Sequence, residues 1–154
     1  MNIFITGGTS GIGLALARFY AAEGHRVGVC GRNTARIDRS DEVNKLLLAY
    51  QLDVCDKDAL TAAVEVFCAD KGLDMMIVAA GYYRNGVTEE VDFEQTSQML
   101  KVNIVGALNA MEVAREAMNA SGGHLVVIAS VAGLLHYPCA SVYAKCKRAL
   151  IQIA

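Results

Sequence analysis

Three side chains in the last quarter of this 154-residue sequence have types and a spacing that suit proton transfer to a bound molecule. Tyr143 and Lys147 are four residues apart, so on a helix they share one face, with Cβ atoms about 5–6 Å apart. An ammonium at that distance favours the ionised phenol, and a tyrosine in this setting can act as an acid or a base. Ser130 lies thirteen residues before Tyr143. A Tyr-x-x-x-Lys pair also occurs by chance on protein surfaces, so its meaning depends on the elements that position it.

Ser130 directly follows an apolar segment, which we predict to be the last of five strands. The strands alternate with helical segments, a pattern typical of the α/β class with a doubly wound parallel sheet, Rossmann-like, in the order 3-2-1-4-5. Open sheets of this kind bind ligands at the carboxyl ends of their strands, where Ser130 lies. The predicted strands are 3–5, 26–30, 47–52, 75–79 and 124–129.

A glycine-rich segment follows the first predicted strand and opens the first helix. Gly7 and Gly11 allow a tight turn and the close approach of a ligand, and Gly13 lets the helix pack against the strand. The first N–H groups of the helix then face a pyrophosphate. We therefore expect a dinucleotide site, whose candidate residues in this segment are Gly7, Thr9, Ser10, Gly11, Ile12 and Gly13.

The spacing T-G-x-x-x-G-x-G, joined with Ser130, Tyr143, Lys147 and Asn103, resembles the short-chain dehydrogenase/reductase family over the entire chain. The resemblance implies that Tyr143 is the general acid in reduction and the general base in oxidation. It implies that Lys147 assists the tyrosine and hydrogen-bonds the nicotinamide ribose, and that Ser130 polarises and orients a carbonyl. Asn103 would interrupt helix pairing and hold a water in a proton relay; a helix kink without chemistry is its alternative role.

The end of the second predicted strand indicates which cofactor is bound. NAD-binding folds usually have a carboxylate there, which accepts hydrogen bonds from the ribose 2′-hydroxyl. This chain has Gly31, Arg32 and Asn33 instead, and an arginine attracts a 2′-phosphate. We therefore expect NADP in preference to NAD, with a solvated surface arginine as the alternative interpretation of Arg32.

The resemblance implies further cofactor contacts after the third and fourth strands. Asp53 and Asp56 could each contact the adenine amino group or cap the following helix. Family members usually have Asn-Asn-Ala-Gly beside the adenosine, where this chain has Val-Ala-Ala-Gly over residues 78–81. The remaining candidate cofactor residues are Arg32, Asn33, Asp53, Val54, Ala80, Gly81, Tyr143 and Lys147.

The substrate and partner predictions are coarser. Loop residues at the same edge of the sheet suggest a partly apolar pocket for a small carbonyl or alcohol substrate: Tyr82, Tyr83, Leu134, Leu135, His136, Tyr137 and Pro138. A long helix over 93–119 has an apolar arc wide enough to bury more than one face. The resemblance implies a homodimer or homotetramer through this helix and a helix over 141–154.

Composition excludes several other classes. The net charge of −2 and the lack of a long apolar run suggest neither a nucleic-acid partner nor a membrane. The five cysteines and three histidines are too scattered for a metal site, so we expect reduced thiols in a cytoplasmic protein.

Members of the resembled family continue through two more strands, a substrate lid and a Pro-Gly turn at the nicotinamide. We therefore predict one NAD(P)-binding domain over 1–154, truncated on its C-terminal side, with the family's last strands absent. The predicted function is NADP-dependent hydride transfer between the nicotinamide and a carbonyl or alcohol. The alternative is a non-catalytic dinucleotide-binding module or an inactive remnant, and we expect these 154 residues alone to have little or no reductase activity.

Overall fold

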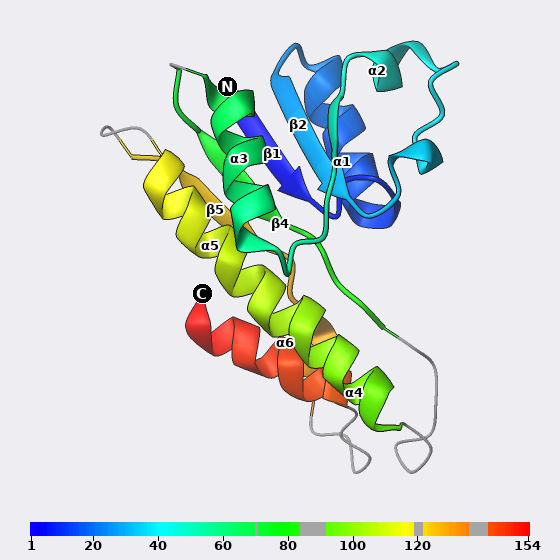
Figure 1. Cartoon of the computed structure of the whole chain (residues 1–154), viewed down its shortest axis with the longest axis vertical. Coiled ribbons are helices and arrows are strands. Elements are labelled where there is room, and N and C mark those ends of the chain that lie inside the picture. The colour runs from blue at the N-terminus through cyan, green and yellow to red at the C-terminus, as the bar shows by residue number, and fades with distance from the viewer. Residues whose placement is uncertain (70, 84–91, 119–121, 136–141) are drawn as a thin grey trace.

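The computed structural model describes residues 1–69, 71–83, 92–118, 122–135 and 142–154. Its centre is a parallel sheet with strand order β3-β2-β1-β4-β5, which confirms the predicted class and order (Figure 1). Every predicted strand is confirmed, with bounds that differ by at most two residues. The strands are β1 (Asn2–Thr6), β2 (Arg26–Gly31), β3 (Leu48–Gln51), β4 (Met75–Val78) and β5 (His124–Val127).

Helices lie between the strands in the sequence: α1 (Gly11–Ala22), α2 (Glu42–Lys45), α3 (Lys57–Cys68), α4 (Phe93–Leu100) and α5 (Gly106–Ala117). A further helix, α6 (Val142–Ile153), follows β5. The predicted helix over 93–119 consists of α4, a π-helical turn at Lys101–Val105 and α5, and its last predicted residue, Asn119, lies outside the described residues. Short 3₁₀ turns occupy Thr34–Arg36 and Val131–Gly133.

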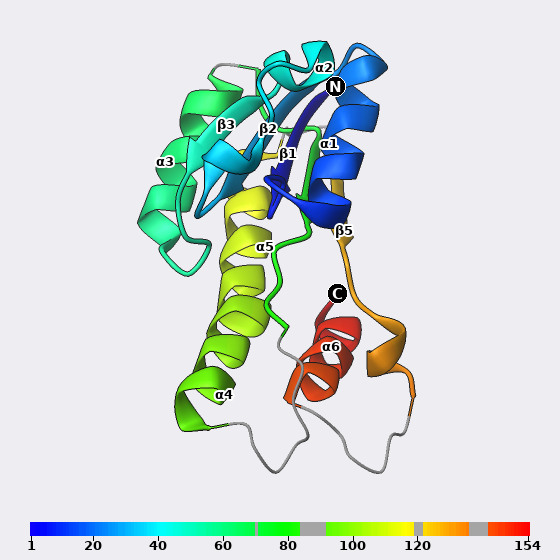
Figure 2. The ribbon, with the colours of Figure 1, turned by 90° about the vertical axis from the view of Figure 1, so that its right-hand side faces the viewer.

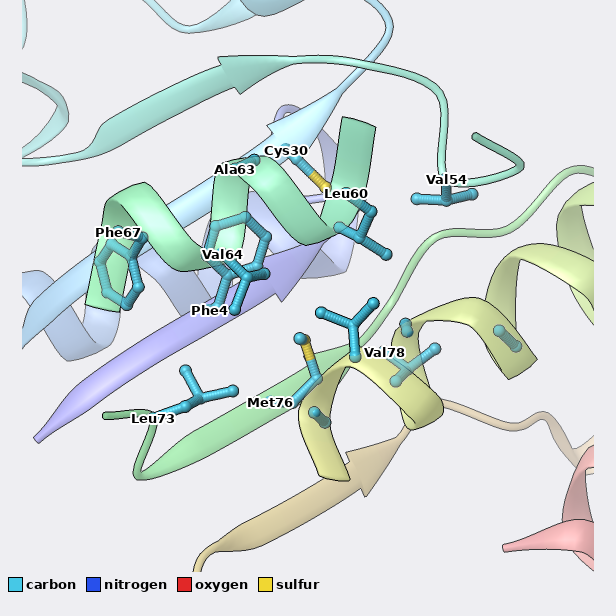
Figure 3. Packing of buried hydrophobic residues seen from close by; sticks show 14 of the residues in the cluster. Phe4, Cys30, Val54, Leu60, Ala63, Val64, Phe67, Leu73, Met76 and Val78 are labelled. Atoms are coloured by element: carbon cyan, nitrogen blue, oxygen red, sulfur yellow. The ribbon is translucent and has the colours of Figure 1, made fainter. Parts of the chain in front are cut away.

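One hydrophobic core lies between the sheet and helices α3 and α5 (Figure 3). Phe4 and Met76 point into it from the sheet, and Val64 and Phe67 from α3. The Phe4 and Phe67 rings meet edge to face, with centroids 5.4 Å apart. Burying side chains of this size contributes about 1.5–3 kcal/mol each, so this core fixes α5 firmly on the sheet. The π-helical turn and α4 precede α5 in the same long helix, so the packing of α5 also positions them beyond the carboxyl edge of the sheet.

The opposite face of the sheet packs against α1 (Figure 2). Ile3 and Ile5 contact this second core, while Phe4 between them faces the first, as alternation along a strand requires. Gly13, Ala17 and Ala21 are the buried residues of α1, and their small size lets the helix lie close to the strands. This close approach brings the first turn of α1 to the ends of β1 and β2.

Beyond the sheet, α6 packs along α4 and the π-helical turn (Figures 1 and 2). Strand β5 is the last strand of the sheet as described, and the side chains of Leu125 and Val126 are exposed on it. In the part of the chain that the structure describes, no helix combines the length and the apolar character needed to cross a membrane.

Candidate active site

A cleft of about 430 Å³ opens at the carboxyl edge of the sheet. Its walls come from the segments that follow β1, β2, β3, β4 and β5, and it includes the point between β1 and β4 where the strand order reverses. Open α/β sheets bind ligands at such a point. All of the residues predicted to bind the cofactor line this one cleft: Gly7, Thr9, Ser10, Gly11, Ile12, Gly13, Arg32, Asn33, Asp53, Val54, Ala80, Gly81, Tyr143 and Lys147.

The glycine-rich loop is built so that only glycine fits at two of its positions. A Cβ atom on Gly13 would lie 2.4 Å from the carbonyl oxygen of Gly7, and one on Gly7 would lie 2.6 Å from the Cα of Ala80. Gly11 differs, because its φ is +53° and a Cβ there would meet nothing within 4 Å. Ser10, the N-cap of α1, makes no side-chain capping hydrogen bond. The open backbone beside Gly11 therefore leaves the N-terminal N–H groups of α1 accessible to an anion.

Two arginines line the cleft beyond the end of β2. Arg32 was predicted from the sequence, whereas Arg36 was missed because it lies in a polar stretch without helical periodicity. The structure places Arg36 in the 3₁₀ turn Thr34–Arg36, which begins where Asn33 Oδ1 accepts a hydrogen bond from Ala35 N at 3.0 Å. Both arginine side chains are exposed, and within the described ranges neither forms an ion pair. Two unpaired guanidinium groups thus flank one end of the cleft.

The two aspartates after β3 have separate roles. Asp56 caps α3, since its Oδ1 accepts a hydrogen bond from Ala59 N at 3.0 Å. Asp53 lines the cleft, and its Oδ1 accepts from Cys55 N at 2.9 Å. Burial, with help from the Asp53 carboxylate, raises the pKa of the Cys55 thiol to about 11, so this thiol stays protonated near neutral pH. The sequence had left the two aspartates interchangeable, and the structure assigns the helix cap to Asp56.

Tyr143 and Lys147 share one face of α6 and both reach the cleft, as their spacing predicts. The Lys147 Nζ lies 5.7 Å from the centroid of the Tyr143 ring and donates a hydrogen bond to the Ile128 carbonyl at 2.8 Å. Only 4% of Lys147 is exposed, and this burial lowers the pKa of its ammonium group below the ordinary value. The bond to Ile128 also ties α6 to the end of β5, two residues before Ser130.

Ser130 begins the 3₁₀ turn Val131–Gly133, where its Oγ accepts a hydrogen bond from Ala132 N at 3.2 Å. It lies next to Ala129, which lines the cleft, but it is not itself among the lining residues. Arg148 holds this turn on α6 by donating to the carbonyls of Gly133 at 3.1 Å and Leu135 at 2.9 Å. Ser130 is therefore positioned by its own turn and by a residue adjacent to Lys147.

Asn103 is fully buried in the π-helical turn, which is the interruption of helix pairing expected at this residue. Its Nδ2 donates to the carbonyls of Tyr82 at 2.7 Å and Met99 at 3.0 Å, and its Oδ1 accepts from Tyr82 N at 3.3 Å. The side chain thus holds the loop after β4 against the long helix. Like Ser130, Asn103 lies beside the cleft lining rather than in it.

The model of the short chain dehydrogenase family matches residues 1–154. This chain belongs to the short-chain dehydrogenase family. It is 32% identical over 163 aligned positions to the 3-dehydrosphinganine reductase TSC10B of Arabidopsis thaliana, covering 99% of this chain and 48% of that reductase. It is 30% identical to the 3-oxoacyl-[acyl-carrier-protein] reductase FabG of Chlamydia muridarum, covering 96% of this chain and 62% of the relative. The chain therefore spans about half to two thirds of the length of these curated relatives.

Solved structures show the same fold. The structure of ElxO with NADP bound superposes with a TM-score of 0.86 at 27% identity, covering 99% of this chain and 64% of ElxO. ElxO therefore has the same fold as this chain and has been solved with NADP bound.

The predicted substrate residues fall into three groups in the structure. Tyr82 and Tyr83 line the cleft. Leu134 and Leu135 are exposed on the surface and do not line this cleft, so their role in a substrate pocket stays a prediction. The 3₁₀ turn that precedes these two leucines is held on α6 by the hydrogen bond from Arg148 to the Gly133 carbonyl. The other three, His136, Tyr137 and Pro138, lie outside the described residues.

Proposed function

We propose that this chain carries the cofactor site and the proton-transfer residues of an NADP-dependent short-chain oxidoreductase. Its reaction is hydride transfer between the nicotinamide and a small carbonyl or alcohol substrate. The observation that supports this most directly is one cleft lined by the glycine-rich loop, two unpaired arginines, Tyr143 and Lys147. We also propose that residues 1–154 act as one dinucleotide-binding unit. A cytoplasmic location belongs to the same proposal and rests on the scattered cysteines of the sequence.

The residues of the cleft fit a dinucleotide with a 2′-phosphate. The open backbone at Gly11 leaves room for the pyrophosphate at the N-terminus of α1. Arg32 and Arg36 would hold the 2′-phosphate through charge-assisted hydrogen bonds. Asp53 would accept from the adenine amino group. The NADP-bound relative ElxO supports a nicotinamide dinucleotide as the cofactor.

The remaining residues account for the proton. When bound, the nicotinamide supplies or accepts the hydride. Tyr143 exchanges the proton with the substrate oxygen, and the buried Lys147 Nζ, 5.7 Å from its ring centroid, would hydrogen-bond the nicotinamide ribose. Ser130 orients the substrate oxygen from the end of β5. Both Nδ2 hydrogens of Asn103 are donated, to the carbonyls of Tyr82 and Met99, so a relay water would bind this side chain at the second acceptor position of Oδ1.

We further propose a homodimer or homotetramer formed through α4, α5 and α6. Apolar side chains are exposed along these helices, and Phe93 is the most accessible at 88%. Large exposed apolar groups on neighbouring helices are typical of a subunit interface. The exposed residues are Phe93, Leu100, Val105, Leu108, Ile151 and Ile153.

Titrating NADPH and NADH into the purified chain at one ionic strength tests the cofactor site. We expect tighter binding of NADPH, and Arg32→Ala should narrow the difference between the two nucleotides. Arg115→Ala is the matched control, because Arg115 is an exposed arginine on α5 that does not line the cleft. Equal affinities in the parent chain would refute the cofactor preference.

Activity distinguishes the second candidate function, a non-catalytic dinucleotide-binding module. The position of Ser130 beside the cleft lining, rather than in it, favours this alternative. Following NADPH oxidation with a panel of ketones separates the two. In a full-length version of the protein, turnover that Tyr143→Phe abolishes supports the oxidoreductase, whereas nucleotide binding without turnover identifies a binding module.

A further inference from the structure

An aromatic side chain outside the Ser130, Tyr143 and Lys147 group lies directly against the proton-transfer tyrosine. The rings of Tyr83 and Tyr143 have centroids 4.9 Å apart and planes inclined by 60°. The distance and tilt lie in the range that attractive aromatic pairs adopt. Both residues line the cleft, and the Lys147 Nζ also lies near the Tyr143 ring, 5.7 Å from its centroid. Tyr143 is thus contacted by a second aromatic ring as well as by the lysine.

The backbone beside Tyr83 is held in place from the long helix. Asn103 Nδ2 donates to the carbonyl of Tyr82, and Asn103 Oδ1 accepts from its N–H, so one side chain binds both polar groups of the residue before Tyr83. Gly81 lets the same loop pass close by, because a Cβ there would lie 3.2 Å from Asn103 Oδ1 and 3.8 Å from Lys147 Nζ. The position of Tyr83 is therefore set by a fully buried side chain.

We propose that Tyr83 is a positioning residue for Tyr143, whose ring it holds in the orientation that presents the phenol oxygen to the substrate. This role rests on the proposed function, in which Tyr143 exchanges the proton. Core packing does not explain the contact, since 58% of Tyr83 is exposed. Asn103, in the π-helical turn, thus holds the loop that carries Tyr83, and Tyr83 in turn contacts the Tyr143 ring. Without the Tyr83 ring, Tyr143 would sample unproductive orientations.

The test compares three variants at this position with one matched control. Tyr83→Phe keeps the ring, Tyr83→Leu keeps apolar volume without a ring, and Tyr83→Ala removes both. Phe19→Ala is the control, because Phe19 is 59% exposed and its ring lies 5.3 Å from that of Tyr20 on α1, yet it does not line the cleft. Each variant is measured for melting temperature, NADPH affinity, kcat and KM. Ring-labelled tyrosine NMR gives a readout independent of activity, since the chain has six tyrosines and Tyr143→Phe assigns one.

We expect Tyr83→Ala and Tyr83→Leu to shift the Tyr143 ring signals and to lower kcat about two- to tenfold. This factor corresponds to the interaction energy of an aromatic pair, which would favour the productive orientation of the Tyr143 ring over the others. Tyr83→Phe and Phe19→Ala should keep parental kcat and Tyr143 signals, and NADPH affinity should stay unchanged in all four. Parental Tyr143 signals or parental kcat in Tyr83→Ala would overturn the proposal, as would an equal loss of kcat in Phe19→Ala. If these 154 residues turn over no ketone, as the sequence predicts, the Tyr143 signals alone decide whether Tyr83 positions the ring. A parent chain that binds neither NADPH nor NADH would refute the proposed function without deciding the role of Tyr83.

Discussion

Gly11 and Gly24 form a matched pair that tests whether the glycine-rich loop binds a phosphate. Both have positive φ angles, +53° and +82°, and a Cβ atom added to either would meet nothing within 4 Å. Gly11 lies at the N-terminus of α1 and lines the cleft, whereas Gly24 follows the other end of the same helix. Alanine at either position therefore has the same backbone cost, and only one of the two alanines lies where the nucleotide would bind.

The expected magnitudes separate stability from binding. A non-glycine residue in the left-handed region costs about 1–2 kcal/mol, so both variants should melt roughly 2–8 °C below the parent. On Gly11 the new methyl group would also occupy the close approach of the pyrophosphate. Inserting a methyl group into filled space costs about 1–3 kcal/mol, which corresponds to a Kd for NADPH about 5- to 150-fold weaker. For Gly24→Ala we expect a Kd equal to that of the parent.

Calorimetric titration of NADPH, with thermal unfolding of the same samples, measures both quantities. Gly24→Ala is the control for the loss of stability, because both variants place an alanine at a positive φ angle. If Gly11→Ala bound NADPH as tightly as Gly24→Ala does, the pyrophosphate would not lie at the N-terminus of α1, and the assignment of the loop would be wrong.

Three further predictions concern the arginines, the phenol and an acid-sensitive contact. Arg36→Ala should weaken NADPH binding while leaving NADH binding unchanged; equal effects on both nucleotides in a titration would show that Arg36 contacts no 2′-phosphate. In a full-length version of the protein, Tyr143→Phe should lower kcat by about 100- to 10,000-fold with NADPH affinity retained, and near-parental rates would exclude this acid–base assignment. The hydrogen bond from Arg18 at 3.0 Å, followed by that from a backbone N–H, holds the pKa of Asp41 below its ordinary value. Because the pKa of Asp41 is lower in the folded state, the carboxylate stabilises the fold above about pH 4, and this stabilisation is lost as the pH falls through the folded pKa. Asp41→Asn should therefore flatten the acid side of a plot of melting temperature against pH, and an unaltered plot would contradict this.

The parts of the fold that the sequence predicts well are those encoded over a few neighbouring residues. Apolar runs such as Met75–Val78 mark buried parallel strands, and their carboxyl ends bring distant loops to one edge. The glycine spacing and the four-residue step from Tyr143 to Lys147 are likewise patterns within a short stretch of sequence. Strand order and the cleft follow from these patterns because right-handed crossovers leave few other arrangements.

The parts that the sequence could not predict depend on contacts between distant segments. Arg36 reaches the cleft through a 3₁₀ turn that has no periodicity to reveal it. Asn103 marks a helix interruption, but its partner, the backbone of Tyr82, lies 21 residues away and carries no side-chain signal. Similarly, Asp53 and Asp56 both precede a helix, and only the hydrogen bond to Ala59 distinguishes the cap.

The replacement of the family's usual asparagines by Val78 and Ala79 raises the question of what holds the end of β4 in this chain. The structure shows that Thr6, at the end of β1, does so. Thr6 is fully buried, its carbonyl accepts from Ala79 N at 3.2 Å, and its Oγ1 accepts from Ala80 N at 3.3 Å. The next residue, Gly7, lies so close to Ala80 that no side chain fits between them. One threonine therefore both satisfies the backbone that leaves β4 and fixes the start of the glycine-rich loop against it, which explains how the cleft keeps its shape without side-chain amides at this point.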